Sequence, residues 1–136
     1  MEKIAVIQVR GTIGVNAPIK STLKSLRLHS QNHCAVIPKT PEYLGMIQNA
    51  KDFLTWGEID DSTYASLVEK RGEEFKGAKD EHGRYLVEGS RMLKKYFRLN
   101  PPRKGYGRKG TKQAFSDGGA LGYRGAKIND LIQRMM

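Results

Sequence analysis

Cysteine, long hydrophobic runs and acidic side chains are all scarce in this chain of 136 residues. The sole cysteine, Cys34, excludes an intrachain disulfide and a thiolate cluster around structural zinc, and it favours a reducing compartment. The apolar stretch Ile4 to Val9 is too short for a signal peptide, and no stretch approaches the roughly 20 apolar residues of a membrane-spanning helix. The sequence therefore predicts a soluble, cytoplasmic protein.

Residues that build hydrophobic cores are also few, and they are unevenly distributed. Leu, Ile, Val and Phe total 30 residues, of which 17 lie in residues 1–60. A segment folds only if it buries enough apolar surface to offset the loss of conformational entropy. We therefore expect a self-sufficient core over residues 1–60 and an extension over residues 61–136 that packs on it.

Basic side chains are abundant, with 24 Lys and Arg against 14 Asp and Glu and a formal net charge of +10. Residues 61–136 carry 17 basic and nine acidic side chains, and the run from Arg91 to Lys112 has nine basic residues and no acidic one. Such a run repels itself until a polyanion neutralises it, so it predicts an anionic partner and ordering upon binding. The alternative is a solvated basic linker, which would seldom contain aromatic residues such as Tyr96, Phe97 and Tyr106.

Residues 1–60 show a β-α-β-α-β pattern, which predicts an α+β fold. Ile4 to Gly11 is typical of a central strand buried on both faces, and the segments His33 to Ile37 and Phe53 to Trp56 predict two further strands. Helices are predicted after Asn16 and Thr40, each with proline in the first turn. Sixty residues suffice for two layers, so the face of the sheet without helices needs water, the extension or a partner.

Two glycines interrupt this pattern. Gly45 lies inside the second predicted helix, where glycine costs about 1 kcal/mol relative to alanine, so it predicts close approach of another backbone or a ligand. Gly57 lies within the third strand, which opens with Phe53 to Trp56 and ends before Asp60, and it is compatible with a β-bulge.

The extension contains three segments with helical patterns. Asp60 or Asp61 could cap a short helix over residues 62–70, and residues 85–97 show a moderate helical pattern that ends before Pro101. Near the C-terminus, apolar residues recur at helical spacing and predict an amphipathic helix with a packing face: Ile128, Leu131, Ile132 and Met135.

Several ordered blocks resemble one family. In the front part they are residues 8–11, 26–29, 32–33, 40–47 and 55–59, and in the extension they are Phe97 to Gly105 and Gly118 to Gly125. The chain resembles ribosomal protein thirty of the large subunit, in its long archaeal form, related to eukaryotic ribosomal protein seven. Leu44 and Asn100 depart from the family, whose members usually carry Arg and often His at these positions.

The resemblance implies a ferredoxin-like core with sheet order 3-1-2 and a non-catalytic structural role. It also implies binding to large-subunit rRNA, with 5S rRNA as a further candidate, among neighbouring ribosomal proteins and as a monomer within the ribosome. No cofactor and no metal are expected. The basic pattern and the resemblance together nominate these RNA-binding residues: Arg10, Lys20, Lys24, Arg27, His29, Asn32, Thr40, Gly45, Met46, Arg98, Arg103, Lys104, Tyr106, Arg108, Lys109, Lys112, Tyr123 and Arg124.

Other residue patterns in the sequence suggest rival functions. Gly105 to Gly110 satisfies G-x-G-x-x-G, but no buried strand precedes it and no apolar helix follows. Gly105 to Lys112 nearly mimics a P-loop, but it ends in Thr-Lys instead of Lys-Thr, which reverses the phosphate-binding cation and the magnesium-binding hydroxyl. His33 and Cys34 would point to opposite faces of a strand, which opposes a shared metal ion with His29. Asp60 and Asp61 with Glu58 are candidates for a carboxylate pair in acid-base catalysis, but a helix cap at a strand-helix junction explains them more simply. A small RNA-modifying or nucleotide-using enzyme is the alternative function, and a free regulatory RNA binder is a third.

Overall fold

The computed structural model describes residues 3–11, 14, 16–28, 30–71, 85–88, 91–94, 96–103, 105 and 113–136. Its helices are α1 (Ala17–Ser25), α2 (Pro41–Asn49), α3 (Asp61–Arg71) and α4 (Ile128–Met135). The strands are β1 (Lys3–Gln8), β2 (His33–Pro38), β3 (Leu54–Glu58), β4 (Tyr85–Glu88), β5 (Arg91–Lys94), β6 (Tyr96–Arg98) and β7 (Gly122–Tyr123). Two short 3-10 turns cover Phe115–Asp117 and Gly125–Lys127. None of the helices in these ranges is long and apolar enough to cross a membrane.

Five strands form one mixed sheet in the order β6-β2-β1-β3-β7. The apolar, β-branched strand β1 lies at the centre and pairs antiparallel with both β2 and β3. The extension adds a strand at each edge, because β6 pairs antiparallel with β2 and β7 pairs parallel with β3. The predicted α+β class is confirmed, and the sheet is wider than the three strands of residues 1–60.

The first two helices start where the sequence predicts, although the side chain of Asn16 makes no cap hydrogen bond to α1. Pro18 lies in the first turn of α1, where its missing N–H would have no intrahelical partner. Thr40 caps α2, because its hydroxyl oxygen accepts the main-chain N–H of Tyr43 at 3.4 Å.

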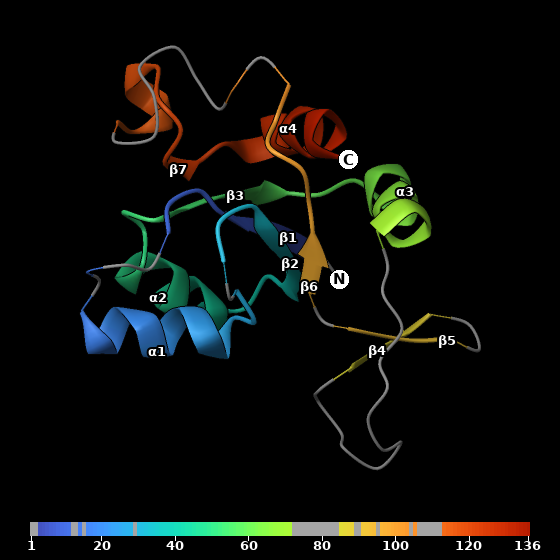
Figure 1. The fold of residues 1–136 in the computed structure, drawn as a ribbon, viewed down its shortest axis with the longest axis horizontal. Helices are drawn as coiled ribbons and strands as arrows, with labels where there is room; N and C mark the ends of the chain where they lie inside the picture. The colour runs from blue at the N-terminus through green and yellow to red at the C-terminus, as the bar shows by residue number, and fades with distance from the viewer. Residues whose placement is uncertain are drawn as a thin grey trace.

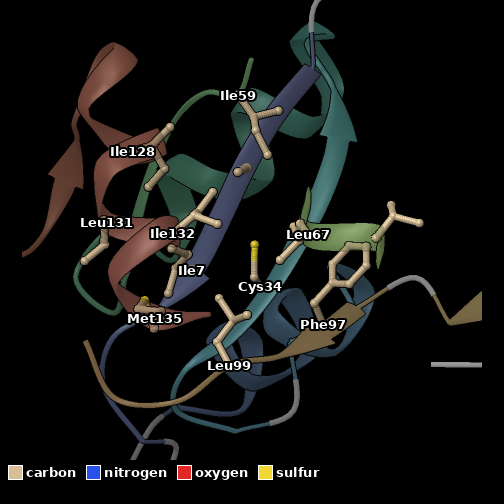
Figure 2. Packing of buried hydrophobic residues seen from close by; sticks show 12 residues of the cluster. Ile7, Cys34, Ile59, Leu67, Phe97, Leu99, Ile128, Leu131, Ile132 and Met135 are labelled. Atoms are coloured by element: carbon tan, nitrogen blue, oxygen red, sulfur yellow. The ribbon is translucent and has the colours of Figure 1, made fainter. Parts of the chain in front are cut away.

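Helices α1 and α2 lie on one side of the main sheet and α4 on the other (Figure 1), and a hydrophobic core lies on each side. The core beneath α1 and α2 contains Val6, Leu23, Ile47 and Trp56, all from residues 1–60. On the other face, Ala5, Ile7, Cys34 and Ile59 of residues 1–60 pack against eight buried residues of the extension: Leu67, Val68, Phe97, Leu99, Ile128, Leu131, Ile132 and Met135 (Figure 2). The extension therefore adds a third layer to the two-layer unit. It covers the sheet face without helices, which the sequence predicts to need water, the extension or a partner.

The predicted amphipathic helix at the C-terminus is confirmed. All four residues of its predicted packing face are buried at 0% exposure: Ile128, Leu131, Ile132 and Met135. Asn129 and Arg134 on the same helix make polar contacts, which are described below.

Two local predictions are wrong. A helix is predicted over residues 85–97, but residues 85–88, 91–94 and 96–98 form strands, since β4 and β5 pair as a two-stranded antiparallel sheet and β6 joins the main sheet. Gly57 forms no bulge, because the pairing of β3 with β1 runs in continuous register through it. Its lack of a side chain serves a different purpose: an added Cβ would overlap the carbonyl oxygen of Gly125, so glycine lets the extension approach the sheet closely.

Candidate nucleic-acid interface

Three nominated residues lie at one end of the main sheet, where β1 ends and β2 begins. Arg10 follows β1, and its guanidinium lies over the Phe53 ring, 5.1 Å from the ring centroid. The main-chain N–H of Asn32 donates to the carbonyl oxygen of Gln8 at 2.8 Å, and its φ of 70° is in the left-handed region. Arg98 ends β6 opposite His33 and is exposed. Strand pairing thus brings together residues from three distant parts of the chain.

Helix α1 contributes two of the nominated cations. Lys20 and Lys24 are exposed, whereas Leu23 between them is 1% exposed and packs in the core beneath the helix. Arg27 follows the helix with a φ of 66° and a half-buried side chain. Helix amphipathicity therefore directs positive charge to the outer surface of this layer.

The three nominated residues around α2 differ in their surroundings. Thr40 acts as the helix cap, and Met46 is half-buried against the core beneath α1 and α2. Gly45 is exposed, and an added Cβ would meet no atom within 4 Å. No other backbone among the described residues therefore approaches Gly45. Of the two partners that the sequence predicts for this glycine, another backbone or a ligand, the ligand is the one left to test.

The basic run is tied to the C-terminal helix where it leaves the sheet. The exposed Arg103 donates its main-chain N–H to the carbonyl oxygen of Arg134 at 3.2 Å. In return, Nη1 of Arg134 donates to the carbonyl oxygens of Arg103 at 3.0 Å and Gly105 at 2.7 Å. Arg134 also pairs with Asp130 at 3.1 Å. The sequence analysis did not nominate Arg134, although its spacing of four residues from Asp130 is typical of a helical ion pair.

Tyr123 and Arg124 lie at the opposite edge of the sheet from Arg98, on and after β7. Arg124 is only 6% exposed; its Nε donates to Thr55 Oγ1 at 2.8 Å and its Nη2 donates to the carbonyl oxygen of Ala120 at 3.2 Å. Its guanidinium also lies 4.6 Å from the centroid of the Phe115 ring. These contacts engage Arg124 inside the protein, unlike an exposed cation that reaches a phosphate.

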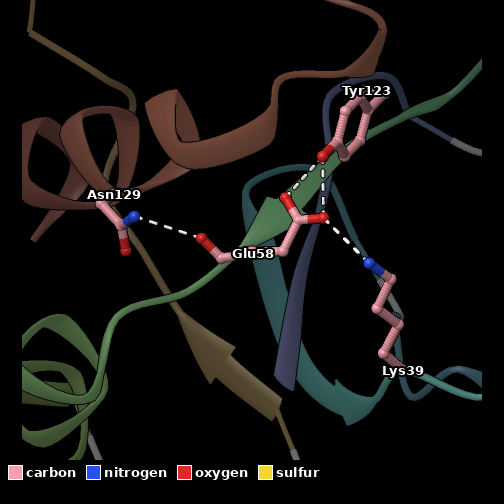
Figure 3. Close-up of polar contacts among 4 residues, drawn as sticks. All are labelled: Lys39, Glu58, Tyr123 and Asn129. Atoms are coloured by element: carbon pink, nitrogen blue, oxygen red, sulfur yellow. Dashed lines mark hydrogen bonds and ion pairs between the residues drawn. The ribbon is translucent and has the colours of Figure 1, made fainter. Parts of the chain in front are cut away.

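Tyr123 is 56% exposed and takes part in a polar network with Glu58 and Lys39 (Figure 3). The hydroxyl of Tyr123 lies 2.7 Å from both carboxylate oxygens of Glu58, and Nζ of Lys39 lies 3.3 Å from Oε1 of Glu58. The Tyr123 hydrogen bond and, more weakly, Lys39 lower the pKa of Glu58 from its ordinary value. Glu58 is therefore an anion that the neighbouring side chains stabilise.

A cavity of about 280 Å³ lies beside this edge, between the loop after α2 and the extension. It is lined by Lys51, Asp52, Trp56, Ala114, Leu121 and Gly122.

The side chains considered for rival chemistry have other surroundings. Burial raises the pKa of the Cys34 thiol to about 12, so the thiol stays protonated and unreactive at neutral pH. His33 stacks on the ring of Tyr96, with 5.2 Å between the ring centroids. Asp60 precedes α3, and its carbonyl oxygen accepts the N–H of Tyr64 at 2.9 Å, as expected at a helix start. In the described ranges, no three His, Cys, Asp or Glu side chains gather as metal ligands.

Six nominated residues lie outside the described residues: His29, Lys104, Tyr106, Arg108, Lys109 and Lys112. The same holds for most of the Gly105 to Gly110 segment and, within the Arg91 to Lys112 run predicted to order on binding, for residues 95, 104 and 106–112. The assignments of these residues remain sequence-based predictions.

Comparison with known proteins gives matches along nearly the whole chain. Residues 4–54 match the family described as ribosomal protein L30p/L7e. Large ribosomal subunit protein uL30 of Nanoarchaeum equitans is 46% identical, over 98% of this chain and 99% of the relative. The proteins of the same name from Methanococcus maripaludis and Methanopyrus kandleri are 45% and 40% identical, covering 97% and 94% of this chain. The similarity thus includes the extension as well as the first five elements.

Proposed function

The chain belongs to the ribosomal protein L30p/L7e family, and from this premise we propose that it is a structural constituent of the large ribosomal subunit that binds rRNA. Members of ribosomal protein families are generally non-enzymatic, and we extend that character to this chain. The proposed role is to hold rRNA segments together by neutralising phosphates and by fitting their shape.

The observation that carries the proposal is the concentration of positive charge in the extension. The run from Arg91 to Lys112 has nine cations and no acidic residue, and Arg98 and Arg103 within it are exposed. Lys20 and Lys24 add exposed charge on α1. Phosphate contacts dominate the affinity of proteins for nucleic acids, and irregular RNA is recognised largely by shape.

Residue groups at the two edges of the main sheet support a bridging role. Arg98 lies on the edge strand β6, with Asn32 beside it just before β2, whereas Tyr123 lies on β7 at the opposite edge. Strands β2, β1 and β3 lie between these two edge strands and keep the two groups at a fixed separation. We propose that the groups contact different rRNA segments, with 5S rRNA as one candidate, and that neighbouring ribosomal proteins adjoin the complex in the cytoplasm.

No described residue favours the enzyme alternative. The thiol of Cys34 is buried and protonated, and the carboxylate of Glu58 is held as an anion by Tyr123 and Lys39. A general acid would need a raised carboxyl pKa and a nucleophilic cysteine would need a lowered thiol pKa, and both shifts run in the opposite direction here.

The first experiment is co-sedimentation of the tagged full-length chain with ribosomal subunits. We expect the protein in the large-subunit fraction at moderate salt, and a protein that stays at the top of the gradient would instead indicate the free regulatory RNA binder. The second experiment measures affinity for deproteinised large-subunit rRNA at several KCl concentrations. Replacing Arg103, Lys104, Arg108 and Lys109 by Gln should reduce the slope of log affinity against log salt by about 2.8, since each lost phosphate contact changes it by roughly 0.7.

A matched control replaces four cations outside the basic run by Gln: Lys51, Lys70, Arg71 and Lys127. Lys39 is left unchanged because it pairs with Glu58. Both variants lose the same net charge. An equal decrease in slope for the two would show that overall charge, rather than the basic run, determines RNA binding.

A further inference from the structure

Among the described residues, Tyr123 is the large hydrophobic side chain that is exposed to solvent. Its main chain is fixed by the pairing of β7 with β3, in which Tyr123 lies opposite Trp56, and by the N–H of Arg124, which donates to the Trp56 carbonyl oxygen at 2.7 Å. The ring therefore projects from a rigid strand and not from a loop.

The orientation of the ring is also restrained at its far end. The hydroxyl hydrogen bond to the Glu58 carboxylate, at 2.7 Å, joins β7 to the end of β3 (Figure 3). An added Cβ on Gly125 would come within 3.6 Å of the Tyr123 hydroxyl, so the ring lies close to the backbone on that side. An exposed aromatic ring that is held in one orientation loses little conformational entropy when a planar ligand stacks on it.

The charges around the ring distinguish between a base and a phosphate as the ligand. The Glu58 anion beside the hydroxyl opposes a phosphate at that end of the ring, and a neutral base carries no such penalty. Lys39, whose side chain is 39% exposed, places a positive charge on the other side of Glu58. This arrangement suits a base on the ring and a flanking phosphate near Lys39.

We propose that Tyr123 is a stacking platform for an unpaired nucleobase of the large-subunit rRNA, and that Glu58 is a positioning residue that orients the ring. The inference rests on the proposed function, and it adds a contact that depends on stacking rather than on charge. Base stacking on an aromatic side chain is tolerant of base identity, so the site selects an unpaired nucleotide rather than a particular sequence.

The test compares Tyr123→Leu and Tyr123→Phe with the wild-type chain. Leucine keeps apolar bulk without the aromatic ring, and phenylalanine keeps the ring without the hydroxyl. Affinity for deproteinised large-subunit rRNA is measured by filter binding at four KCl concentrations. We expect Tyr123→Leu to weaken binding by about fivefold to 150-fold, the range for one base stacked on an aromatic ring, with an unchanged salt slope. Tyr123→Phe keeps the ring but loses the hydrogen bond to Glu58, so we expect a smaller loss of affinity than in Tyr123→Leu, similar to that in Glu58→Ala.

Each other result overturns the proposal in a distinct way. Wild-type affinity for Tyr123→Leu would show that no base stacks on the ring. A salt slope changed by about 0.7 would indicate a phosphate contact instead. Equal losses for both variants would assign the contact to the hydroxyl. If the wild-type chain itself fails to bind rRNA, the proposed function fails, and this outcome is separable from the others.

A double-mutant cycle tests the positioning role of Glu58. Glu58→Ala should alter RNA affinity more in the wild-type chain than in the Tyr123→Leu variant, because orientation matters only when the ring is present. Additive effects would overturn the role of Glu58 and leave the stacking contact to be judged by the Tyr123 variants alone. Thermal unfolding of each variant confirms that the compared proteins are folded.

Discussion

The side-chain oxygen of Asn129 accepts the main-chain N–H of Asp60 at 2.8 Å, which joins the C-terminal helix to the junction between the sheet and α3. The amide nitrogen of Asn129 donates to the carbonyl oxygen of Glu58 at 3.2 Å (Figure 3) and to that of Ala126 at 2.9 Å. Asn129 is 8% exposed, so its three hydrogen bonds are largely shielded from water. A single amide side chain thus connects the extension to the core at the third strand.

We expect Asn129→Ala to lower the free energy of unfolding by about 1–3 kcal/mol, because it leaves shielded main-chain groups without partners. Urea denaturation followed by circular dichroism measures the change. The matched control is Gln133→Ala on the exposed side of α4, which should change stability by no more than about 0.5 kcal/mol. Equal effects of the two substitutions would contradict the role of Asn129.

Arg124 was nominated as an RNA-binding residue, and its buried contacts predict a structural role. Arg124→Met should destabilise the protein by about 1–3 kcal/mol, because the Ala120 carbonyl oxygen loses its guanidinium donor. The control is Arg98→Met, a cation that is exposed on β6. We expect Arg98→Met to reduce the salt slope of rRNA binding by roughly 0.7 with little effect on stability, and Arg124→Met to do the reverse. A reduced slope for folded Arg124→Met would restore Arg124 as a phosphate contact.

Much of the first sixty residues and the C-terminal helix was predictable because local signals and burial agree there. The β-branched run of β1, the Thr40 cap with Pro41, and the four apolar residues of α4 each specify an element without help from distant residues. The edge strands were not predictable in the same way. β7 has two residues and β6 has three, too few for an alternation of apolar and polar residues to be visible in the sequence. Both strands form because they pair with the edges of β2 and β3.

The site was less predictable than the fold because its key contacts join residues far apart in sequence. Tyr123 meets Glu58 across 65 positions, and Arg124 meets Thr55 across 69. A buried arginine is rare, so residue type favoured an exposed phosphate contact for Arg124. The prediction of a helix over residues 85–97 was wrong because its apolar residues fit a helical pattern, whereas pairing of β4 with β5 and of β6 with β2 decides the structure of residues 85–88, 91–94 and 96–98.

Glu58 should make stability depend on pH in the acid range. Its pKa is lower in the folded protein than its ordinary value because Tyr123 and Lys39 stabilise the anion. The stabilisation is therefore fully present above the unfolded-state pKa, and it is lost as the pH falls through the lower folded-state pKa. Stability measured from pH 7 down to about 3 should fall less steeply in Glu58→Gln than in the wild type, with divergence starting near the ordinary Glu pKa of about 4.3. Parallel curves would contradict this coupling.

The division at residue 60 can be tested with a fragment of residues 1–60. The core beneath α1 and α2 remains complete in the fragment, which supports the sequence-based prediction of a cooperative fold. The fragment exposes Ala5, Ile7, Cys34 and Ile59, so we expect it to unfold at a lower urea concentration than the full chain. A fragment without a cooperative transition would contradict the two-part division, and one as stable as the full chain would show that the second core contributes little.

Gly45 offers a test in which stability and RNA binding should change in opposite directions. Because Gly45 lies in α2 with open space around it, Gly45→Ala should stabilise the free protein by about 0.5–1 kcal/mol. If rRNA approaches the helix closely at this point, as the nomination of Gly45 predicts, the added methyl group should weaken rRNA binding despite the gain in stability. Gln48→Ala, an exposed substitution in the same helix, is the control for helix propensity and should leave affinity unchanged. Wild-type affinity for Gly45→Ala would show that the RNA backbone does not reach this glycine.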